Sequence, residues 1–266
     1  MAKLYLRNLT AETSTSQLKT NLISWWNLEE ASGQRNDSHG TNHLTDNNTV
    51  TQATGRVGSA AQFTAANSEK LNITSNASLQ TGNIDFSFAG WVYLDTKTAN
   101  RGFWGKWNLA SNNDYLCYYD LAGDRFYWGL DGPTTSIFHP ANSLGSPATG
   151  VWYFIYVEHD SVNNFARIQV NNGTMDSGAY SDGVSVGTAP FDIGYVGDGI
   201  IHDGRIDSVG FWKRTLTADE KTWLYNGGNG RSYSELPPRQ SPTDGEKSTA
   251  LPVGTFSGNS GSGFED

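Results

Sequence analysis

The sequence predicts an all-β fold in which two antiparallel sheets face each other, with one short C-terminal helix and extended terminal arms. Three observations lead to this prediction. Short runs that alternate apolar and polar residues recur along the chain, and 30 glycines with many Asn, Ser and Thr residues separate them. Only residues 217–225 have a helical pattern. Strands at this density in 266 residues are typical of a two-sheet sandwich.

The predicted strands alternate in polarity and end in turn residues. In the segment 84–94, Phe86 and Phe88 lie on one face of the strand. Asn172-Gly173 closes another alternating segment and is a strong signal for a tight turn. The predicted strands are 22–28, 84–94, 115–119, 125–130, 151–157, 165–170, 190–195 and 204–212.

Residues 204–220 are the most informative part of the chain. Ile206 and Phe211 belong to a strand that leads directly into Thr217, and Glu220 follows three residues later. That spacing is a capping box, which opens a helix. We therefore expect one buried strand to run into one short helix near the C-terminal end.

Composition divides the chain into three parts. Residues 1–20 form a predicted N-terminal arm, residues 21–233 a single globular domain, and residues 234–266 a tail rich in Pro, Gly and Ser. Segments of the tail's composition bury too little apolar surface to fold alone. The arm and the tail are therefore expected to become ordered on a partner.

Charge and cysteine content bear on the partners. Eighteen basic and 27 acidic residues give a net charge of −9, so nucleic acid is not expected as a partner, whereas calcium suits an acidic chain. Cys117 is the only cysteine, so it is expected to be a small buried hydrophobe. Neither a signal peptide nor a membrane-spanning stretch is predicted, so we expect no membrane insertion.

Several motifs occur in an informative order. They are Trp25-Trp26-Asn27-Leu28-Glu29-Glu30, Asp37-Ser38-His39-Gly40-Thr41-Asn42, Val57-Gly58-Ser59-Ala60-Ala61-Gln62-Phe63, Phe86-Ser87-Phe88-Ala89-Gly90-Trp91 and Gly150-Val151-Trp152. From Leu22 to about Tyr225, this series resembles the laminin-G-like jelly-roll domains of the concanavalin A-like lectin/glucanase superfamily. The resemblance implies a jelly-roll sandwich that binds rather than cuts. Gly210, which interrupts the final strand, is a departure from the pattern.

The resemblance also implies a calcium ion between the first loop and the last strand. Asp37 and Asp207 would supply carboxylates, and carbonyl groups near Gly40 and Asn42 would complete an oxygen shell. In the alternative interpretation, Asp37 caps a turn and Asp207 accepts backbone hydrogen bonds.

A group of aromatic residues in Gly- and Asn-rich segments is the candidate ligand-binding site. Aromatic faces beside amide and carboxylate groups suit a sugar ring, which has apolar C–H faces and hydroxyl edges. The same rings suit packing beneath loops or contact with another protein subunit. The candidates are Trp104, Trp107, Tyr115, Tyr118 and Trp128.

Catalytic residues are not expected. Glycoside hydrolysis needs two carboxylates across the scissile bond, and Glu158-His159-Asp160 is the nearest approach to the acidic strand motif of the glucanases. The five histidines lack metal-ligand spacing.

These observations favour a non-catalytic surface module, most simply a decoration or fibre protein of a phage-type virion. Its arms would dock on capsid or tail proteins, the sandwich would face outward toward cell-surface glycans, and the protein would self-associate on the virion surface. The alternative is a free calcium-dependent carbohydrate-binding lectin with dispensable tails.

Overall fold

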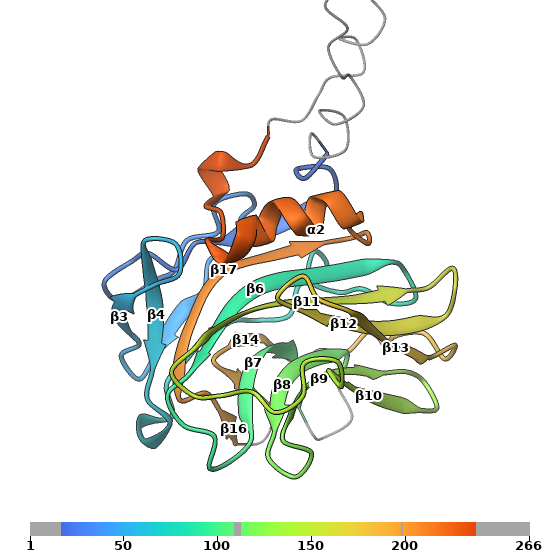
Figure 1. Cartoon of the computed structure of the whole chain (residues 1–266), viewed down its shortest axis with the longest axis horizontal. Helices are drawn as coiled ribbons and strands as arrows, with labels where there is room; N and C mark the ends of the chain where they lie inside the picture. Colours follow the sequence, from blue (N-terminus) through green and yellow to red (C-terminus); the bar gives the residue numbers. More distant parts are fainter. Residues whose placement is uncertain (1–16, 109–112, 198, 238–266) are drawn as a thin grey trace, which may run out of the picture.

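Two antiparallel sheets pack face to face in the computed structural model, which describes residues 17–108, 113–197 and 199–237 (Figure 1). This confirms the predicted all-β sandwich. The first sheet has eight strands, and its members in spatial order are β13 (Met175–Ala179), β12 (Phe165–Val170), β11 (Trp152–Asp160), β6 (Phe86–Leu94), β17 (Gly204–Trp212), β4 (Ser59–Phe63) and β3 (Thr51–Thr54), with β1 (Leu22–Trp26) also paired to β17.

The second sheet has seven strands and lies below the first in Figure 1. Its members in spatial order are β10 (Ser136–Pro140), β9 (Arg125–Asp131), β8 (Tyr115–Asp120), β7 (Arg101–Lys106), β14 (Phe191–Ile193), β5 (Lys70–Ile73) and β2 (Thr45–Asn47). The remaining elements are the pair β15 (Tyr195–Val196) and β16 (Ile200–Ile201), the helix α2 (Ala218–Tyr225), and the 3-10 turns η1 (Ala65–Asn67), η2 (Asn226–Gly228) and η3 (Tyr233–Glu235).

Aromatic side chains from both sheets fill the space between them. Phe88 of β6 stacks on Phe211 of β17, with ring centroids 4.4 Å apart, and on Phe191 of the facing sheet at 5.9 Å. Aromatic rings bury a large apolar area each, so this layer supplies much of the hydrophobic stabilisation of the sandwich. Cys117 lies in the same core, as predicted.

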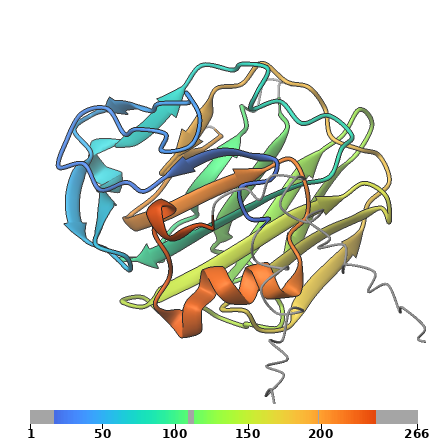
Figure 2. The same ribbon diagram turned by 90° about the horizontal axis from the view of Figure 1, so that it is seen from above.

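A second cluster, which we call the outer cluster, covers the opposite face of the eight-stranded sheet. The helix α2 lies across this face (Figures 1 and 2). Its Leu224 packs in the cluster with side chains from the strands beneath. The buried members of the outer cluster are Leu18, Leu22, Trp25, Ala89, Trp91, Phe154, Tyr156, Trp212, Leu216, Leu224 and Leu236.

The closing segment has the predicted form. The strand β17 spans residues 204–212, and α2 begins directly after Thr217. The Thr217 hydroxyl accepts a hydrogen bond from the backbone N–H of Glu220, and the Glu220 side chain accepts one from the N–H of Thr217. This is the predicted capping box.

Both ends of the described chain lie in the outer cluster. The indole N–H of Trp212 donates a hydrogen bond to the carbonyl oxygen of Leu18 at 2.7 Å, and Leu18 and Leu236 are buried. The packed residues therefore extend a little beyond the predicted domain, 21–233. The rest of the predicted arm and tail, residues 1–16 and 238–266, lies outside the described residues. Within the described part, no helix has the length and apolar character needed to cross a membrane.

Candidate ligand-binding site

Three of the five predicted aromatic residues lie in the core between the sheets. Trp104, Tyr115 and Trp128 have no exposed surface, because they occupy the inward-facing positions of β7, β8 and β9. The hydroxyl of Tyr115 donates to the carbonyl of Leu79, and the indole N–H of Trp128 donates to the carbonyl of Glu158. This burial corrects the expectation that these three rings meet a ligand.

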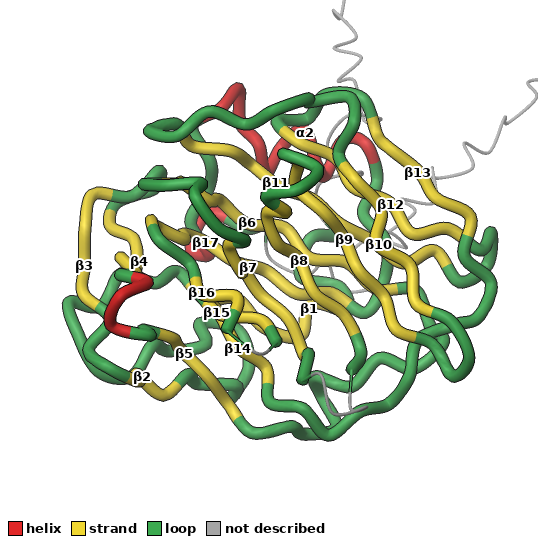
Figure 3. Tube along the Cα trace, turned by 90° about the horizontal axis from the view of Figure 1, so that it is seen from below, coloured by secondary structure: helices red, strands yellow, loops and turns green. Residues whose placement is uncertain are grey.

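The other two lie together on the outer face of the seven-stranded sheet, which Figure 3 shows from below. Trp107 and Tyr118 are 7% and 9% exposed, and both pack against Phe138, which is 43% exposed. The cavity beside Trp107 measures about 130 Å³. Typical ligand sites measure about 300–1,000 Å³. Contact between this pair and a ligand stays a prediction.

The two predicted calcium ligands do not fit a calcium ion. Asp37 accepts four backbone hydrogen bonds, from the N–H groups of Trp25, His39, Gly40 and Asn42. N–H donors suit a carboxylate but repel a cation, and calcium needs six to eight oxygen ligands. The part of the chain that is described contains no group of three or more His, Cys, Asp or Glu side chains arranged for a metal.

Asp207 likewise meets donors rather than oxygen ligands. Its Oδ2 accepts the backbone N–H groups of Arg56 and Val57 at 2.7 and 2.8 Å, and its Oδ1 accepts the hydroxyl of Ser208. Burial raises the pKa of Asp207 to about 7, although these hydrogen bonds oppose the shift. The alternative interpretation of both aspartates, as acceptors of backbone hydrogen bonds, therefore describes the structure.

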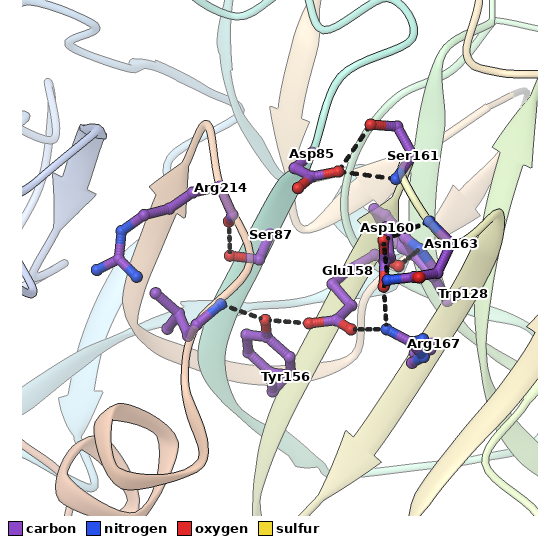
Figure 4. Close-up of polar contacts among 11 residues, drawn as sticks. Asp85, Ser87, Trp128, Tyr156, Glu158, Asp160, Ser161, Asn163, Arg167 and Arg214 are labelled. Carbon is purple, nitrogen blue, oxygen red and sulfur yellow. Dashed lines mark hydrogen bonds and ion pairs between the residues drawn. The ribbon is translucent and has the colours of Figure 1, made fainter. Parts of the chain in front are cut away.

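The candidate catalytic pair Glu158 and Asp160 forms an ion network on β11 (Figure 4). Both carboxylates accept from the same nitrogen of Arg167, at 2.6 and 2.7 Å. Glu158 also accepts the hydroxyl of Tyr156. Burial alone would raise the pKa of Asp160, but hydrogen bonds from Asn163 and Arg167 outweigh it and hold that pKa below its ordinary value. Asp160 is thus a poor proton donor, and a shared guanidinium satisfies both acids.

A larger cavity opens on the outer face of the eight-stranded sheet, at the C-terminal end of α2. Its volume is about 430 Å³, which falls in the range of small-molecule sites. Segments far apart in the sequence meet there: the β3–β4 turn, β6, the start of β11, the end of β12 and the turn after α2. The lining residues are Arg56, Trp91, Gly150, Val151, Trp152, Asn171, Tyr225, Gly227 and Gly228.

Aromatic rings form much of the cavity wall. Trp91 is 3% exposed, and its ring stacks on that of Tyr225 with centroids 5.9 Å apart and planes inclined by 18°. Trp152 is half-buried and packs against Tyr93 at 5.4 Å. Two partly exposed rings, Trp152 and Tyr225, therefore face an opening of the size of a sugar ring or a disaccharide.

Two polar side chains of the cavity, Arg56 and Asn171, carry hydrogen-bond donors. The guanidinium of Arg56 lies over the ring of Trp91, 5.4 Å from its centroid, and its Nε is buried without a partner among the described residues. Asn171, which also lines the cavity, uses its amide oxygen to accept the N–H of Phe154, so its Nδ2 group remains as a donor. Of the described residues that line this cavity, Arg56 is the single charged one.

Asp207 positions Arg56 through the backbone. The turn 55–58 carries Arg56 into the cavity, and the buried carboxylate of Asp207 holds the N–H groups of Arg56 and Val57. Gly55 permits this contact, since a Cβ at that position would lie 2.6 Å from Asp207 Oδ2. The sequence offered the acceptance of backbone hydrogen bonds as one of two interpretations of Asp207, but it did not connect this carboxylate with Arg56.

The sequence indicated no role for Arg56 or Tyr225, and it showed Trp91 and Trp152 only as parts of motifs that resemble the family. The segment Gly55-Arg56-Val57-Gly58 was the signal that could have pointed to Arg56. Its two glycines predict a turn, and an arginine in a turn is a candidate for ligand contact.

The two-sheet architecture with an open aromatic cavity defines a lectin-like sandwich domain. A family model described as the concanavalin A-like lectin/glucanases superfamily matches residues 64–220, more than half of the chain. The chain belongs to this superfamily, of the laminin-G-like type. No curated protein sequence matches the chain.

Solved structures with the same fold include binding domains and enzymes. The binding domain of Paraclostridial Mosquitocidal Protein 1 is 17% identical, with a TM-score of 0.64 over 80% of this chain and 53% of that one. This chain thus spans about half the length of that toxin domain. Domain 4 of AbnA, a GH43 extracellular arabinanase from Geobacillus stearothermophilus solved with arabinotriose, is 17% identical (TM-score 0.57; 79% of this chain and 98% of that one). The sialidase of Trypanosoma rangeli is 12% identical (TM-score 0.56; 78% and 33%). The fold alone does not separate binding from catalysis.

Proposed function

We propose that this protein is a non-catalytic saccharide-binding module whose ligand occupies the cavity between Arg56, Trp152 and Tyr225. The observation that carries this proposal is the meeting of partly exposed aromatic rings and unpaired donors in about 430 Å³. Aromatic faces pack against the C–H faces of a pyranose, and Arg and Asn donors bind its oxygen atoms. The arabinotriose on domain 4 of AbnA supports the same use of this fold.

The proposed absence of catalysis depends on the carboxylates. No acidic residue lines the cavity among the described residues. The nearest candidate pair, Glu158 and Asp160, shares the guanidinium of Arg167 and has exposures of 4% and 7%. Glycosidases need one protonated and one ionised carboxyl group facing the glycosidic bond.

Trp152→Ala tests the site. We expect at least a tenfold loss of saccharide affinity by titration calorimetry, since about 1.4 kcal/mol is tenfold and a central aromatic contact exceeds that. The matched control is Trp223→Ala, which removes a half-buried tryptophan of α2 outside the cavity. Equal losses in the two variants, or no loss in either, would overturn the assignment of the site. A thermal melt of each variant verifies folding.

The finer proposal is that the sandwich is a decoration or fibre component of a phage-type virion, docked through its arms on capsid or tail proteins and on further copies of itself. Leu18 and Leu236 support it, because both lie in the outer cluster and both ends of the described part of the chain therefore lie on one face. The cavity opens on this same face. Docking and saccharide binding are compatible only where the partner leaves the end around Arg56 and Trp152 open.

A free calcium-dependent lectin is the alternative that calcium removal tests. The carboxylates of Asp37 and Asp207 accept hydrogen bonds from backbone N–H groups, and such surroundings do not suit calcium. We therefore expect the same saccharide affinity in excess calcium and in a chelator. A loss of affinity in the chelator would support the alternative.

A further inference from the structure

We propose that the cavity selects saccharides that carry an acidic group, a carboxylate or a sulfate, and that Arg56 is the residue that recognises it. This inference rests on the proposed function and adds the chemical class of the ligand. It depends on the charge of Arg56, on the planar shape of its guanidinium and on the hydrogen bonds that hold its backbone.

The charge balance of the cavity points to an anion. The whole chain carries a net charge of −9. Among the described residues that line this cavity, however, Arg56 is the single charged one and none is acidic. Arg56 is half-buried and has no carboxylate partner among the described residues, which carries a desolvation cost that an anionic ligand in the cavity would offset. Its stacking over Trp91 at 5.4 Å compensates only part of that cost.

The other arginines of the described ranges that lie near acids show the contrast. Arg167 binds Glu158 and Asp160, and Arg214 binds both oxygens of Glu220 at 2.7 Å. The guanidinium of Arg56 contacts no carboxylate in the described residues. Arg56 instead lines the cavity that the ligand would occupy.

The shape of the guanidinium and its surroundings define how the ligand would bind. A planar guanidinium donates two parallel hydrogen bonds to a carboxylate or sulfate. The rings of Trp152 and Tyr225 line the same cavity and would hold the sugar ring, while the Nδ2 group of Asn171 would bind a hydroxyl. Recognition of the acid and packing of the ring are therefore separate contributions from separate residues.

The backbone of Arg56 is fixed before the ligand arrives. Its N–H and that of Val57 are held by Asp207, a completely buried carboxylate. A preorganised donor loses less conformational entropy on binding, which favours discrimination over a flexible surface arginine.

The experiment compares methyl β-glucuronide with methyl β-glucoside, which differ only in the C6 carboxylate, and adds glucose 6-sulfate as the sulfate arm. Titration calorimetry of the full chain should show the two anionic ligands binding about tenfold or more tightly than the glucoside, since hydrogen bonds between two charged groups are stronger than those to a neutral hydroxyl. Arg56→Gln should bring the ratio near one, because the anionic ligands should lose more affinity than the glucoside does. Arg125→Gln, on β9 of the other sheet, is the control with the same charge change.

The outcomes separate this inference from the proposed function. Equal binding of charged and neutral ligands, lost in Trp152→Ala, would overturn the acid selectivity and leave the saccharide site standing. An anion preference that Arg56→Gln and Arg125→Gln reduce equally would also overturn it, because long-range charge would then be the cause. Preference abolished only by Arg56→Gln supports it. Preference for one anion alone assigns the ligand to the carboxylate or the sulfate class.

Discussion

Asp207 is completely buried on β17, and its carboxylate holds the turn that carries Arg56. Burial raises its pKa to about 7, so the group changes charge near neutral pH. Because the folded-state pKa lies above the ordinary value of 3.8, the group contributes most to the free energy of unfolding at low pH. That contribution falls as the pH rises from about 4 to about 7.

Asp207→Asn isolates this titration. An asparagine keeps an oxygen that accepts the N–H groups of Arg56 and Val57 but does not ionise. The difference in the free energy of unfolding, wild type minus variant, should fall as the pH rises from 4 to 7, by up to about 1.4 kcal/mol per pH unit. Urea denaturation at five pH values measures it, and a difference that does not depend on pH would contradict the prediction.

Gly210 illustrates what the sequence alone could not show at this scale. A glycine here predicts an interruption of the last strand, but β17 continues through Gly210 after an irregularity in register between Asp207 and Gly210. A Cβ at this position would lie 2.4 Å from the ring of Trp212. Trp25 and Trp212 pack edge to face, 6.0 Å apart, across the space that the glycine leaves.

The elements β11 and β12 are joined by the network of Glu158, Asp160 and Arg167. Glu158 pairs with Arg167 across the strands, and the hydroxyl of Tyr156 links the network to the backbone N–H of Leu216, just before α2. One guanidinium therefore serves two nearly buried carboxylates and joins the sheet to the helix-bearing segment. The presence of Glu158 and Asp160 on β11 is therefore explained by a structural role in this network.

Arg167→Leu should be strongly destabilising at neutral pH. It leaves two nearly buried carboxylates without their shared cation, which costs about 3 kcal/mol or more. Because the pKa of Asp160 is held below its ordinary value, its stabilising contribution is present above that value and is lost as the pH falls through the lowered pKa. The loss in the variant should therefore shrink toward pH 3.

Denaturation of Arg167→Leu at pH 7 and pH 3 measures this, with Arg231→Leu as the control. Arg231 pairs with Glu235 in an exposed i,i+4 arrangement, and its removal should change stability by about 1 kcal/mol or less. An equal loss for Arg167→Leu at both pH values would show that packing, rather than charge, explains it.

The elements that the sequence predicted well have strong local signals. The boundaries of β17 and the start of α2 follow from alternation and the Thr217–Glu220 capping box, which depend on neighbouring residues. The predicted strand 190–195 instead divides at Gly194 into β14 and β15. Short strands such as β2 and β3 were not predicted, because partly exposed polar segments are fixed by their neighbours in the sheet.

For the molecule as a whole, the fold was predictable and the cavity was not. The order of motifs survives in the sequence because each motif is local. The cavity forms where Arg56, Trp91, Trp152, Asn171 and Tyr225 meet, and these residues come from five separate segments. Strand alternation also placed Trp104, Tyr115 and Trp128 inward, which composition alone does not reveal.

The packing of both chain ends in the outer cluster gives the last prediction, a comparison of two deletions. Removing residues 1–16 and 238–266 leaves every contact described above in place. Removing residues 1–20 and 234–266 also removes Leu18 and Leu236, which are 0% and 2% exposed, and takes from Trp212 its hydrogen-bond acceptor. Burial of each leucine contributes about 2 kcal/mol. The longer deletion should therefore lower the Tm by roughly 8–16 °C relative to the shorter one.

The docking proposal is therefore tested with the shorter deletion, because a failure of this variant to assemble cannot be attributed to unfolding. It should bind saccharide as the full chain does, since Arg56, Trp152 and Tyr225 are untouched. If the arms dock the sandwich on a particle, this variant should no longer copurify with capsid or tail proteins. Copurification at the level of the full chain would overturn docking through the arms and leave the saccharide site as the function of an independent module.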